Sequence, residues 1–434
     1  MTRTSRLAGF YKLPIDERRR ELAKQCGFDA SRLEGPLLDE ETANHMVENV
    51  VAVYGLPLGV ALNFQINGRD FLIPMCVEEP SVIAAASNAA KMIRQGGGFH
   101  AEADDPIMIT QVQITGVPDT ESARTAICAH EAEIIQRANA AYPNLVTRGG
   151  GMRGLEVRVL EGHTDGHRGM LCVHLLIDCR DAMGANLVNT IAEAVAPRLA
   201  ELARGRVGLR ILSNLADRRC VRVKARIPIS ALRTENHTGE EVRDGIVSAS
   251  RFAELDPYRA ATHNKGIMNG VDAVAMATGN DWRGVEAGAH AFAAKLGRDG
   301  GYGPLAVWRV GPDGALEGRI EMPLAVGIVG GTLRVHPGAR LALEILGAQS
   351  ASELGMTMAA AGLASNLAAL RALASDGIQR GHMSLHARSL AMHVGAIGDQ
   401  VDLVAQELAA LGDVRAEVAT QILTRIRMKN GAHA

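Results

Sequence analysis

The feature that most constrains this sequence is the order of strand-like and helix-like segments between Ile107 and Asn214. Polar–apolar alternation or short apolar runs indicate strands, and apolar residues spaced about three to four apart indicate helices. The patterns predict strands at 111–114, 155–159, 169–179 and 207–212, and helices from about 119 and over 186–204. The apolar stripe expected on the first helix consists of Cys128, Ala132, Ile135 and Ala138. The order β-α-β-β-α-β predicts a ferredoxin-like unit, an antiparallel four-stranded sheet with both helices on one face.

This unit, residues 107–214, interrupts a larger one. Residues 1–106 and 215–374 mix helices with strands, and we expect them to form one large α/β domain around the insertion. Residues 375–434 are predicted to form short helices with little apolar mass of their own, which is typical of a piece that packs loosely and moves. The predicted fold class is therefore α+β.

The composition indicates a folded protein of the reducing cytoplasm. The chain has 434 residues, of which 47% are apolar and 22% charged, and its formal net charge is −2. Because there is no basic surplus, nucleic acid and anionic membranes are poor candidate partners. The six cysteines form no CxxC pair and are expected to be reduced. The N-terminus lacks the apolar core of a signal peptide, and the apolar stretches Val50–Phe64 and Leu354–Ala374 are too short or too interrupted for a membrane span.

One glycine-rich motif resembles a nucleotide-binding fingerprint. Residues 149–154, Gly-Gly-Gly-Met-Arg-Gly, formally match G-x-G-x-x-G. A dinucleotide fingerprint needs a strand before the glycines and a helix after them. Because a strand follows here, we reject the Rossmann interpretation and predict a tight turn.

A second motif could bind a metal. His382 and His386 are four residues apart, so they would share a helix face, as in half of a zinc protease site. The glutamate of H-E-x-x-H is missing, and only His393 offers a third ligand. We therefore expect no metal. A metallohydrolase that uses these three histidines is kept as an alternative, which metal analysis would test.

Four further segments place polar residues at predicted turns. They are Glu78–Ser81 before an Ala-rich helix, Asp181–Asn186 where a strand meets a helix, and the Gly-flanked loops His263–Gly270 and Gly279–Trp282. Acids suit a helix start, and small residues let phosphates approach a helix N-terminus. Polar loops often carry chemistry, but taken singly each segment also has an ordinary structural explanation.

Taken together, these segments resemble the class II 3-hydroxy-3-methylglutaryl-CoA (HMG-CoA) reductases of bacteria and archaea. The matching runs are ENV at 48–50, NFQINGRD at 63–70, EEPS at 78–81, DAMGAN at 181–186, DPYRAATHNKGIMNG at 256–270, ATGNDWRGVEAGAHA at 277–291 and GIQRGHMSLHAR at 377–388. They occur in order over essentially the whole chain. The resemblance implies an enzyme that interconverts HMG-CoA with mevalonate and coenzyme A by two successive hydride transfers from NAD(P)H.

The resemblance also implies roles for individual residues. The family's catalytic positions are matched by Glu79, Lys265, Asp281 and His382. Positions that hold the hydroxymethylglutaryl moiety are matched by Ser81, Arg259 and Asn269. The nicotinamide cofactor site, on the small ferredoxin-like domain, would be lined by Asp181, Met183, Gly184, Asn186 and Asn214.

The chemistry explains why such an enzyme needs these residue types. Hydride attack on a thioester leaves negative charge on oxygen, which Lys265 would stabilise. Asp281 would orient that lysine and tune its surroundings. His382, on a mobile C-terminal flap, would protonate the departing coenzyme A thiolate. Glu79 would donate the proton taken up in the second reduction.

The choice between the two nicotinamide cofactors depends on residues near the glycine-rich turn. NADH-using relatives can carry an acid there for the ribose 2′-hydroxyl. No acid lies between Ile134 and Leu155 in this sequence, and the spacing places Tyr142 at that position. Three cations could meet a 2′-phosphate: Arg137, Arg148 and Arg153. The sequence therefore favours NADPH over NADH.

The family implies an assembly as well. Its sites are completed by two chains near the catalytic glutamate and lysine, so a homodimer or larger homo-oligomer is expected. A catalytically silent CoA-binding relative is the alternative of another class. Retention of Glu79, Lys265, Asp281 and His382 together argues against that alternative.

Overall fold

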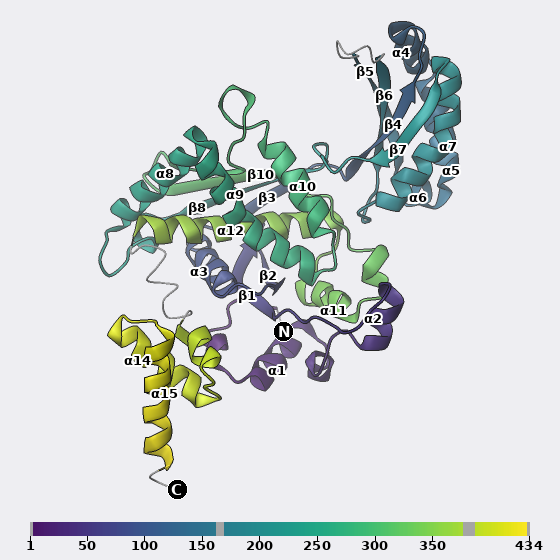
Figure 1. Cartoon of the computed structure of the whole chain (residues 1–434). Helices are drawn as coiled ribbons and strands as arrows, with labels where there is room; N and C mark the ends of the chain where they lie inside the picture. The colour runs from purple at the N-terminus through teal and green to yellow at the C-terminus, as the bar shows by residue number, and fades with distance from the viewer. Residues whose placement is uncertain (1–2, 162–168, 376–386, 432–434) are drawn as a thin grey trace.

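The computed structural model describes residues 3–161, 169–375 and 387–431. A six-stranded and a four-stranded sheet organise these residues. Figure 1 shows the four-stranded sheet and its helices projecting from one end of the larger body, with the C-terminal helices near the opposite end. This mixture of helices with two separate sheets confirms the predicted α+β class, whereas the exact domain boundaries stay a prediction.

The larger sheet has the order β2-β1-β3-β8-β10-β9 and is antiparallel except where β1 meets β3. Alternation explains its strands: in β10, Leu316 and Ile320 are buried while Glu317 and Arg319 are exposed. Its strands are β1 (Leu58–Ile66), β2 (Arg69–Cys76), β3 (Phe99–Ala103), β8 (Cys220–Ile227), β9 (Ala306–Val310) and β10 (Leu316–Pro323).

Helices pack on this sheet and complete the main core. The helices of the larger body are α1 (Ile15–Cys26), α2 (Glu40–Met46), α3 (Val82–Arg94), α8 (Gly239–Leu255), α9 (Pro257–Ala277), α10 (Trp282–Ala293), α11 (Pro337–Leu346) and α12 (Ala351–Ala374). α12 contacts α3, α8 and α9 as well as the sheet, so it is the central element of this body. The buried indole of Trp308 on β9 donates to Asn366 Oδ1 on α12 at 2.8 Å, which satisfies a polar group inside the core.

The apolar composition of α12 follows from this position. In the described part of the chain, α12 is the one helix long and apolar enough to cross a membrane, and 67% of its apolar window is buried inside the protein. Ser350 caps its N-terminus by accepting from the backbone N–H of Glu353. Its composition is therefore that of a core helix.

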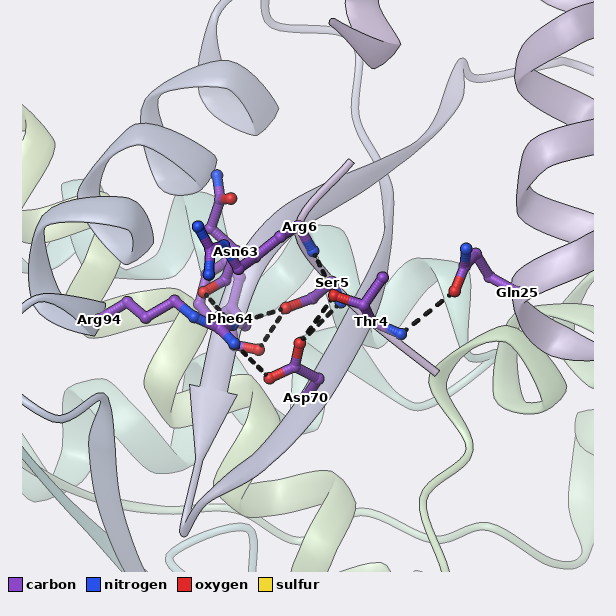
Figure 2. Close-up of polar contacts among 8 residues, drawn as sticks. All are labelled: Thr4, Ser5, Arg6, Gln25, Asn63, Phe64, Asp70 and Arg94. Atoms are coloured by element: carbon purple, nitrogen blue, oxygen red, sulfur yellow. Dashed lines mark hydrogen bonds and ion pairs between the residues drawn. The ribbon is translucent and has the colours of Figure 1, made fainter. Parts of the chain in front are cut away.

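Figure 2 shows how the N-terminal segment is held against the sheet. The Asp70 carboxylate on β2 accepts from the Ser5 backbone N–H at 2.9 Å and from the Arg94 guanidinium of α3 at 2.8 Å. The Ser5 hydroxyl donates to Phe64 O at 2.9 Å. Burial works against ionisation of Asp70, but the Ser5 N–H and Arg94 outweigh it and lower the pKa of that carboxyl. We call Ser5, Asp70 and Arg94 the N-terminal clasp.

The smaller sheet has the ferredoxin-like topology predicted from the sequence. Its order is β5-β6-β4-β7, all neighbours are antiparallel, and α5 and α7 pack against each other. Its elements are β4 (Ile107–Thr115), α4 (Thr120–Ala129), α5 (Glu131–Ala141), α6 (Pro143–Thr147), β5 (Gly151–Leu160), β6 (Met170–Asp178), α7 (Ala185–Ala203) and β7 (Arg206–Leu212). The glycine-rich segment is a turn into β5, with Gly149 and Gly151 at positive φ, so the rejection of a Rossmann fingerprint is consistent with the fold.

The predicted apolar face of the first helix in this unit was wrong at Cys128 and Ala132, whereas Ala138 is buried and Ile135 packs against the core. Cys128 and Ala132 are exposed, and the helix breaks at His130 and continues as α5. The residues that are buried are spaced four, seven and four apart, so they share one helical face that is displaced from the predicted one. The buried positions are Ala123 and Ile127 on α4, and Ile134 and Ala138 on α5.

The C-terminal region is helical, as predicted, but it has more apolar mass than expected. Helical residues 387–393, α14 (Asp399–Leu411) and α15 (Ala416–Gly431) enclose a small core of their own. Val404 and Leu408 on α14 pack in that core with Ile422 and Leu423 on α15. The region therefore has an internal reason to stay folded that does not depend on the larger body.

Candidate active site

The first pair of predicted catalytic residues meets across the larger body. Lys265 Nζ on α9 donates to Glu79 Oε2, in the turn before α3, at 2.9 Å, and Asn269 Nδ2 lies 3.5 Å from the same oxygen. Lys265 and Asn269 are one helical turn apart, so they share a face of α9. The side chains of Lys265 and Glu79 are 61% and 35% exposed. The pair therefore lies at the surface of the single chain, where a substrate can reach it.

The segment that carries Lys265 was predicted to be a loop, and this was wrong. Residues 263–270 lie within α9, whose N-terminus is capped by Asp256 and begins with Pro257. Its polar residues divide between two faces: Lys265 is exposed, while His263 and Asn264 are buried. Burial lowers the pKa of His263 to about 4, so this histidine is a neutral core residue that bonds Ala306 O.

Ser81 occupies a strained position beside Glu79. Its φ is 72°, in the left-handed region that a residue with a Cβ rarely adopts, and it precedes α3 without a side-chain capping bond. Such backbone strain costs about 1–3 kcal/mol and concentrates at functional sites. The strain is consistent with a functional position at the start of α3, and the Ser81 side chain makes no capping bond to the helix.

Arg259 lies one and a half turns before Lys265 on the same helix. Its backbone N–H donates to the Asp256 cap at 2.8 Å, but among the described residues its buried Nε has no hydrogen-bond partner. A buried guanidinium nitrogen without an acceptor is unusual in a folded protein. An anionic ligand, such as a carboxylate, would supply the missing acceptor.

Asp281 lies at the other end of α9. Its carboxylate caps α10 by accepting from Gly284 N at 3.1 Å, and the chain turns there because Asn280 N donates to Ala275 O at 2.8 Å. Lys265 lies ten residues before Ala275, or about 15 Å along a helix. Within the described chain, Lys265 and Asp281 accordingly share no contact.

Asp281 instead lies near Asn214, a predicted cofactor residue. A Cβ placed on Gly284 would lie 2.8 Å from Asp281 Oδ2 and 3.3 Å from Asn214 Oδ1. The side chains of Asp281 and Asn214 therefore face the same glycine. The structure thus divides the predicted residues into two groups, one around Glu79 and Lys265 and one around Asp281 and Asn214.

The DAMGAN run forms the turn from β6 into α7, as predicted. Gly184 is the N-terminal cap of α7 with φ 110°, and a Cβ there would lie 2.5 Å from Cys179 Sγ. Because the cap has no side chain, the first N–H groups of α7 are available to a phosphate. Asn186 is exposed in the first turn and Met183 is half-buried. The Asp181 carboxylate lies at the same turn, and its Oδ1 accepts from Ala351 N at the start of α12, at 3.0 Å.

The histidines considered for a metal site fall mostly outside the described residues. His382 and His386 belong to residues 376–386, so the predicted catalytic histidine has no described position. His393 is exposed on the helical residues 387–393. In the ranges that the structure describes, no group of three or more His, Cys, Asp or Glu side chains could hold a metal ion.

One acidic pair beside the site was missed by the sequence reasoning. Asp272 lies seven residues after Lys265 on α9, and its carboxyl is close to that of Glu286 on α10. Burial, with the Glu286 carboxyl, raises the pKa of Asp272. Glu286 also bonds His290 at 2.7 Å, and His290 bonds the Tyr302 hydroxyl at 2.7 Å. Helical spacing from Lys265 would have identified Asp272, had α9 been recognised as a helix.

Fold and site together define an oxidoreductase with a ferredoxin-like unit inserted into a larger α/β body. The family model for hydroxymethylglutaryl-coenzyme A reductase matches residues 14–387. The chain belongs to this family, and its activity is that of an HMG-CoA reductase, acting on HMG-CoA, mevalonate and coenzyme A.

Individual relatives agree with this assignment. The chain is 48% identical to the 3-hydroxy-3-methylglutaryl-coenzyme A reductase of Archaeoglobus fulgidus over 98% of this chain and 95% of the relative. It is 32% identical to a probable reductase of Borreliella burgdorferi over 90% and 89% of the two chains. A solved structure of the class II reductase of Streptococcus pneumoniae, bound to NADPH in open conformations, matches with a TM-score of 0.79 at 40% identity, covering 96% of this chain and 100% of the other. The chain is thus similar to class II enzymes over nearly its whole length.

Proposed function

We propose that Glu79, Lys265, Asp281 and His382 carry the interconversion of HMG-CoA with mevalonate. The observation that supports this most directly is the 2.9 Å contact between Lys265 and Glu79, with Asn269 beside them. It places one cation and one carboxyl group around a single point at the surface. A reduction that creates charge on oxygen and then takes up a proton needs that combination.

Each side chain has one task. Reduced nicotinamide, when bound, supplies the hydride. Lys265 stabilises the oxyanion that forms when hydride adds to the thioester carbonyl. Glu79 donates a proton to the carbonyl oxygen of the aldehyde in the second reduction, which gives the alcohol. Asp281 orients Lys265, and His382 protonates the coenzyme A thiolate. Arg259, through its unpartnered Nε, binds the carboxylate end of the substrate together with Ser81 and Asn269.

The site is shared between two copies of the chain. Within one chain, Asp281 lies beyond the C-terminal end of α9, and the helical rise from Lys265 to Ala275 alone is about 15 Å. The apolar segment before β1 is open to solvent, with Val51 96% and Tyr54 90% exposed. Apolar residues exposed to this degree are typical of a surface that another chain covers. A homodimer, or a larger homo-oligomer, would bring Asp281 of one copy to Lys265 of the other.

The nicotinamide cofactor is held by the small unit. The uncapped start of α7, at Gly184 and Asn186, offers backbone N–H groups to a phosphate. Arg148 is exposed at the glycine-rich turn, and Arg137, which forms a long 3.8 Å pair with Glu133, is exposed on α5. These two cations support NADPH over NADH. Arg153 is less suitable than expected, since Asp178 already binds it at 3.0 Å. The pneumococcal relative was solved with NADPH.

His382 reaches the site on the C-terminal region, which moves as a flap. The separate core of α14 and α15 lets this region move as one piece. Movement would let spent cofactor leave between the two reductions. The enzyme acts in the cytoplasm, and the pathway in which it works decides the direction of the reaction.

A stoichiometric assay tests the proposal. Purified protein with HMG-CoA and either NADPH or NADH should consume about two cofactors per coenzyme A released, and consumption should disappear in Lys265→Ala. Higher kcat/KM with NADPH than with NADH is expected. Well-folded protein that consumes neither cofactor would reject the reductase assignment of these residues, and a strong NADH preference would reject the NADPH assignment alone.

A further inference from the structure

A short segment of the larger body lies between the loop that carries Asp281 and the DAMGAN turn. This segment, residues 324–329 after β10, we call the spacer. On one side, Gly327 N donates to Asn280 Oδ1 at 2.8 Å, and Asn280 Nδ2 donates to Gly327 O at 3.1 Å. One amide side chain thus bonds both backbone groups of Gly327. Asn280, which holds the spacer, is the residue immediately before Asp281 in the chain.

The DAMGAN turn lies against the other side of the spacer. Ile328 N donates to Asp181 O at 2.9 Å, and Ala182 forms an isolated parallel bridge with Val329. A Cβ on Gly327 would lie 2.5 Å from Met183 N and 3.0 Å from Asp181 O. Backbone contacts this close leave no room for a side chain on Gly327. A single stretch of backbone, the spacer, therefore separates the Asp281 loop from the DAMGAN turn.

A buried arginine side chain hydrogen-bonds both the spacer and the DAMGAN turn. Arg219, 4% exposed, donates through Nη1 to Ala182 O at 3.2 Å and to Met183 O at 3.3 Å, and through Nη2 to Val326 O at 2.5 Å. All three acceptors are backbone carbonyls. Burying a guanidinium is costly unless its hydrogen bonds are made, and only the assembled junction supplies these acceptors. Arg219 accordingly favours this one placement of the small unit's turn.

We infer that Arg219 and Asn280 are positioning residues that set the separation between the cofactor turn and the catalytic Asp281. The inference rests on the proposed roles of the DAMGAN turn and Asp281. Arg219 and Asn280 each hydrogen-bond the backbone of the spacer. They act through the backbone of the spacer, which both of them hold.

The inference predicts a particular kinetic pattern. A displacement of about 1 Å between reacting groups can lower a rate by about a hundredfold. Loss of the Asn280 side chain, or a methyl group at Gly327, should change the placement of the DAMGAN turn relative to Asp281. The group around Glu79 and Lys265 lies elsewhere and should bind HMG-CoA as before.

Steady-state kinetics and direct NADPH titration of the full-length protein test this. Asn280→Ala and Gly327→Ala should each lower kcat at least about tenfold, and Gly327→Ala should also weaken NADPH binding in the titration. The KM for HMG-CoA should stay within about twofold of the parent value. Arg219→Lys, which keeps the cation, should retain more activity than Arg219→Met. Should the latter fail to fold, Asn280→Ala and Gly327→Ala still decide the question.

The matched control is Asn67→Gly. Asn67 makes the same kind of paired bond, to Ala101 N and Ala101 O, each at 2.9 Å, but on the larger sheet. Glycine suits its φ of 49°, so the substitution removes the two bonds without adding strain. This control should leave the kinetic constants within about twofold of the parent.

The outcomes separate the two proposals. Parent-like kcat and NADPH binding in both Asn280→Ala and Gly327→Ala would overturn the positioning role while leaving the proposed function intact. Asn280→Ala and Gly327→Ala could instead weaken HMG-CoA binding and NADPH binding equally, with the same losses in Asn67→Gly. That result would show that the residues only support the fold, and it would also overturn the positioning role. Parent protein that neither binds NADPH nor turns over would overturn both proposals.

Discussion

The Lys265 ammonium lies 2.9 Å from Glu79 Oε2, which joins the middle of α9 to the turn before α3. Both groups are partly exposed, and such an ion pair stabilises a fold by no more than about 1 kcal/mol. The pair is therefore poorly explained as a stabilising contact. Its position beside Ser81, whose backbone is strained, and Asn269 is better explained by chemistry on a ligand.

Removing the Lys265 ammonium should abolish most activity without unfolding the protein. We expect Lys265→Ala to lower kcat by about 10²–10³-fold, the effect of losing one oxyanion donor, with little change in Tm. The control is Lys295→Ala, which removes a comparable surface pair with Asp217 at 3.0 Å and should leave kcat unchanged. Turnover within a few-fold of the parent in Lys265→Ala would contradict the oxyanion role.

The shared site should show complementation between inactive variants. In the proposed dimer, the Lys265 and Asp281 of one site come from different chains, so Lys265→Ala and Asp281→Asn damage different halves of each site. Mixed in equal amounts, unfolded and refolded together, they should recover about a quarter of parent activity: half of the dimers would be mixed, with one intact site each. The mixture should be compared with each variant refolded alone. Absence of recovery despite mixed dimers would place both residues in one chain's site.

Asp272 should make the protein less stable at alkaline pH. Burial and Glu286 raise the pKa of Asp272 to about 8, so the folded state holds its proton more tightly than the unfolded state. The resulting stability is present in full below the ordinary carboxyl pKa and is lost as the pH rises through about 8. Thermal unfolding of Asp272→Asn, followed from pH 5 to 9, should show a smaller loss of Tm than the parent. Parallel curves would mean that Asp272 does not titrate in this way.

Breaking the N-terminal clasp should destabilise the fold and spare catalysis. Asp70→Asn leaves the Arg94 charge largely buried, with side-chain exposures of 20% for Arg94 and 14% for Asp70. We expect a loss of about 2–4 kcal/mol in unfolding free energy, and under about 0.5 kcal/mol for Asp16→Asn, whose partner Arg19 forms a surface pair. Chemical denaturation measures both losses.

The same carboxyl predicts a loss of stability in acid. The pKa of Asp70 is lowered in the folded state, so its contribution is present above the ordinary carboxyl pKa and is lost as the pH falls through the lowered value. Asp70→Asn should remove that part of the acid sensitivity. If the difference between variant and parent were independent of pH, Arg94 would not be pairing with an ionised Asp70.

The small unit was predictable because its signals are local. Alternation within β5 and the apolar run of β6 each depend on neighbours a few residues away. The same reasoning failed at His130, where one helix becomes two, and at residues 263–270, where asparagine, lysine and glycine suggested a loop. In the folded protein those polar residues occupy opposite sides of α9. Burial of Asn264 beneath the segment at Tyr302 is a long-range packing effect that composition does not report.

What the sequence by itself determined is the family and the ferredoxin-like topology of residues 107–214. The family motifs also predict Glu79, Lys265 and Asp281 as catalytic residues. Which residues meet was decided only by the tertiary structure. The length of α9 separates Lys265 from Asp281. The spacer joins Asn280 and Arg219, because Asn280 bonds Gly327 and Arg219 bonds the neighbouring Val326. A sequence motif reports which residue types are present, because a given reaction needs particular functional groups. Distances depend on how rigid helices and strands pack across hundreds of residues, which no local pattern encodes.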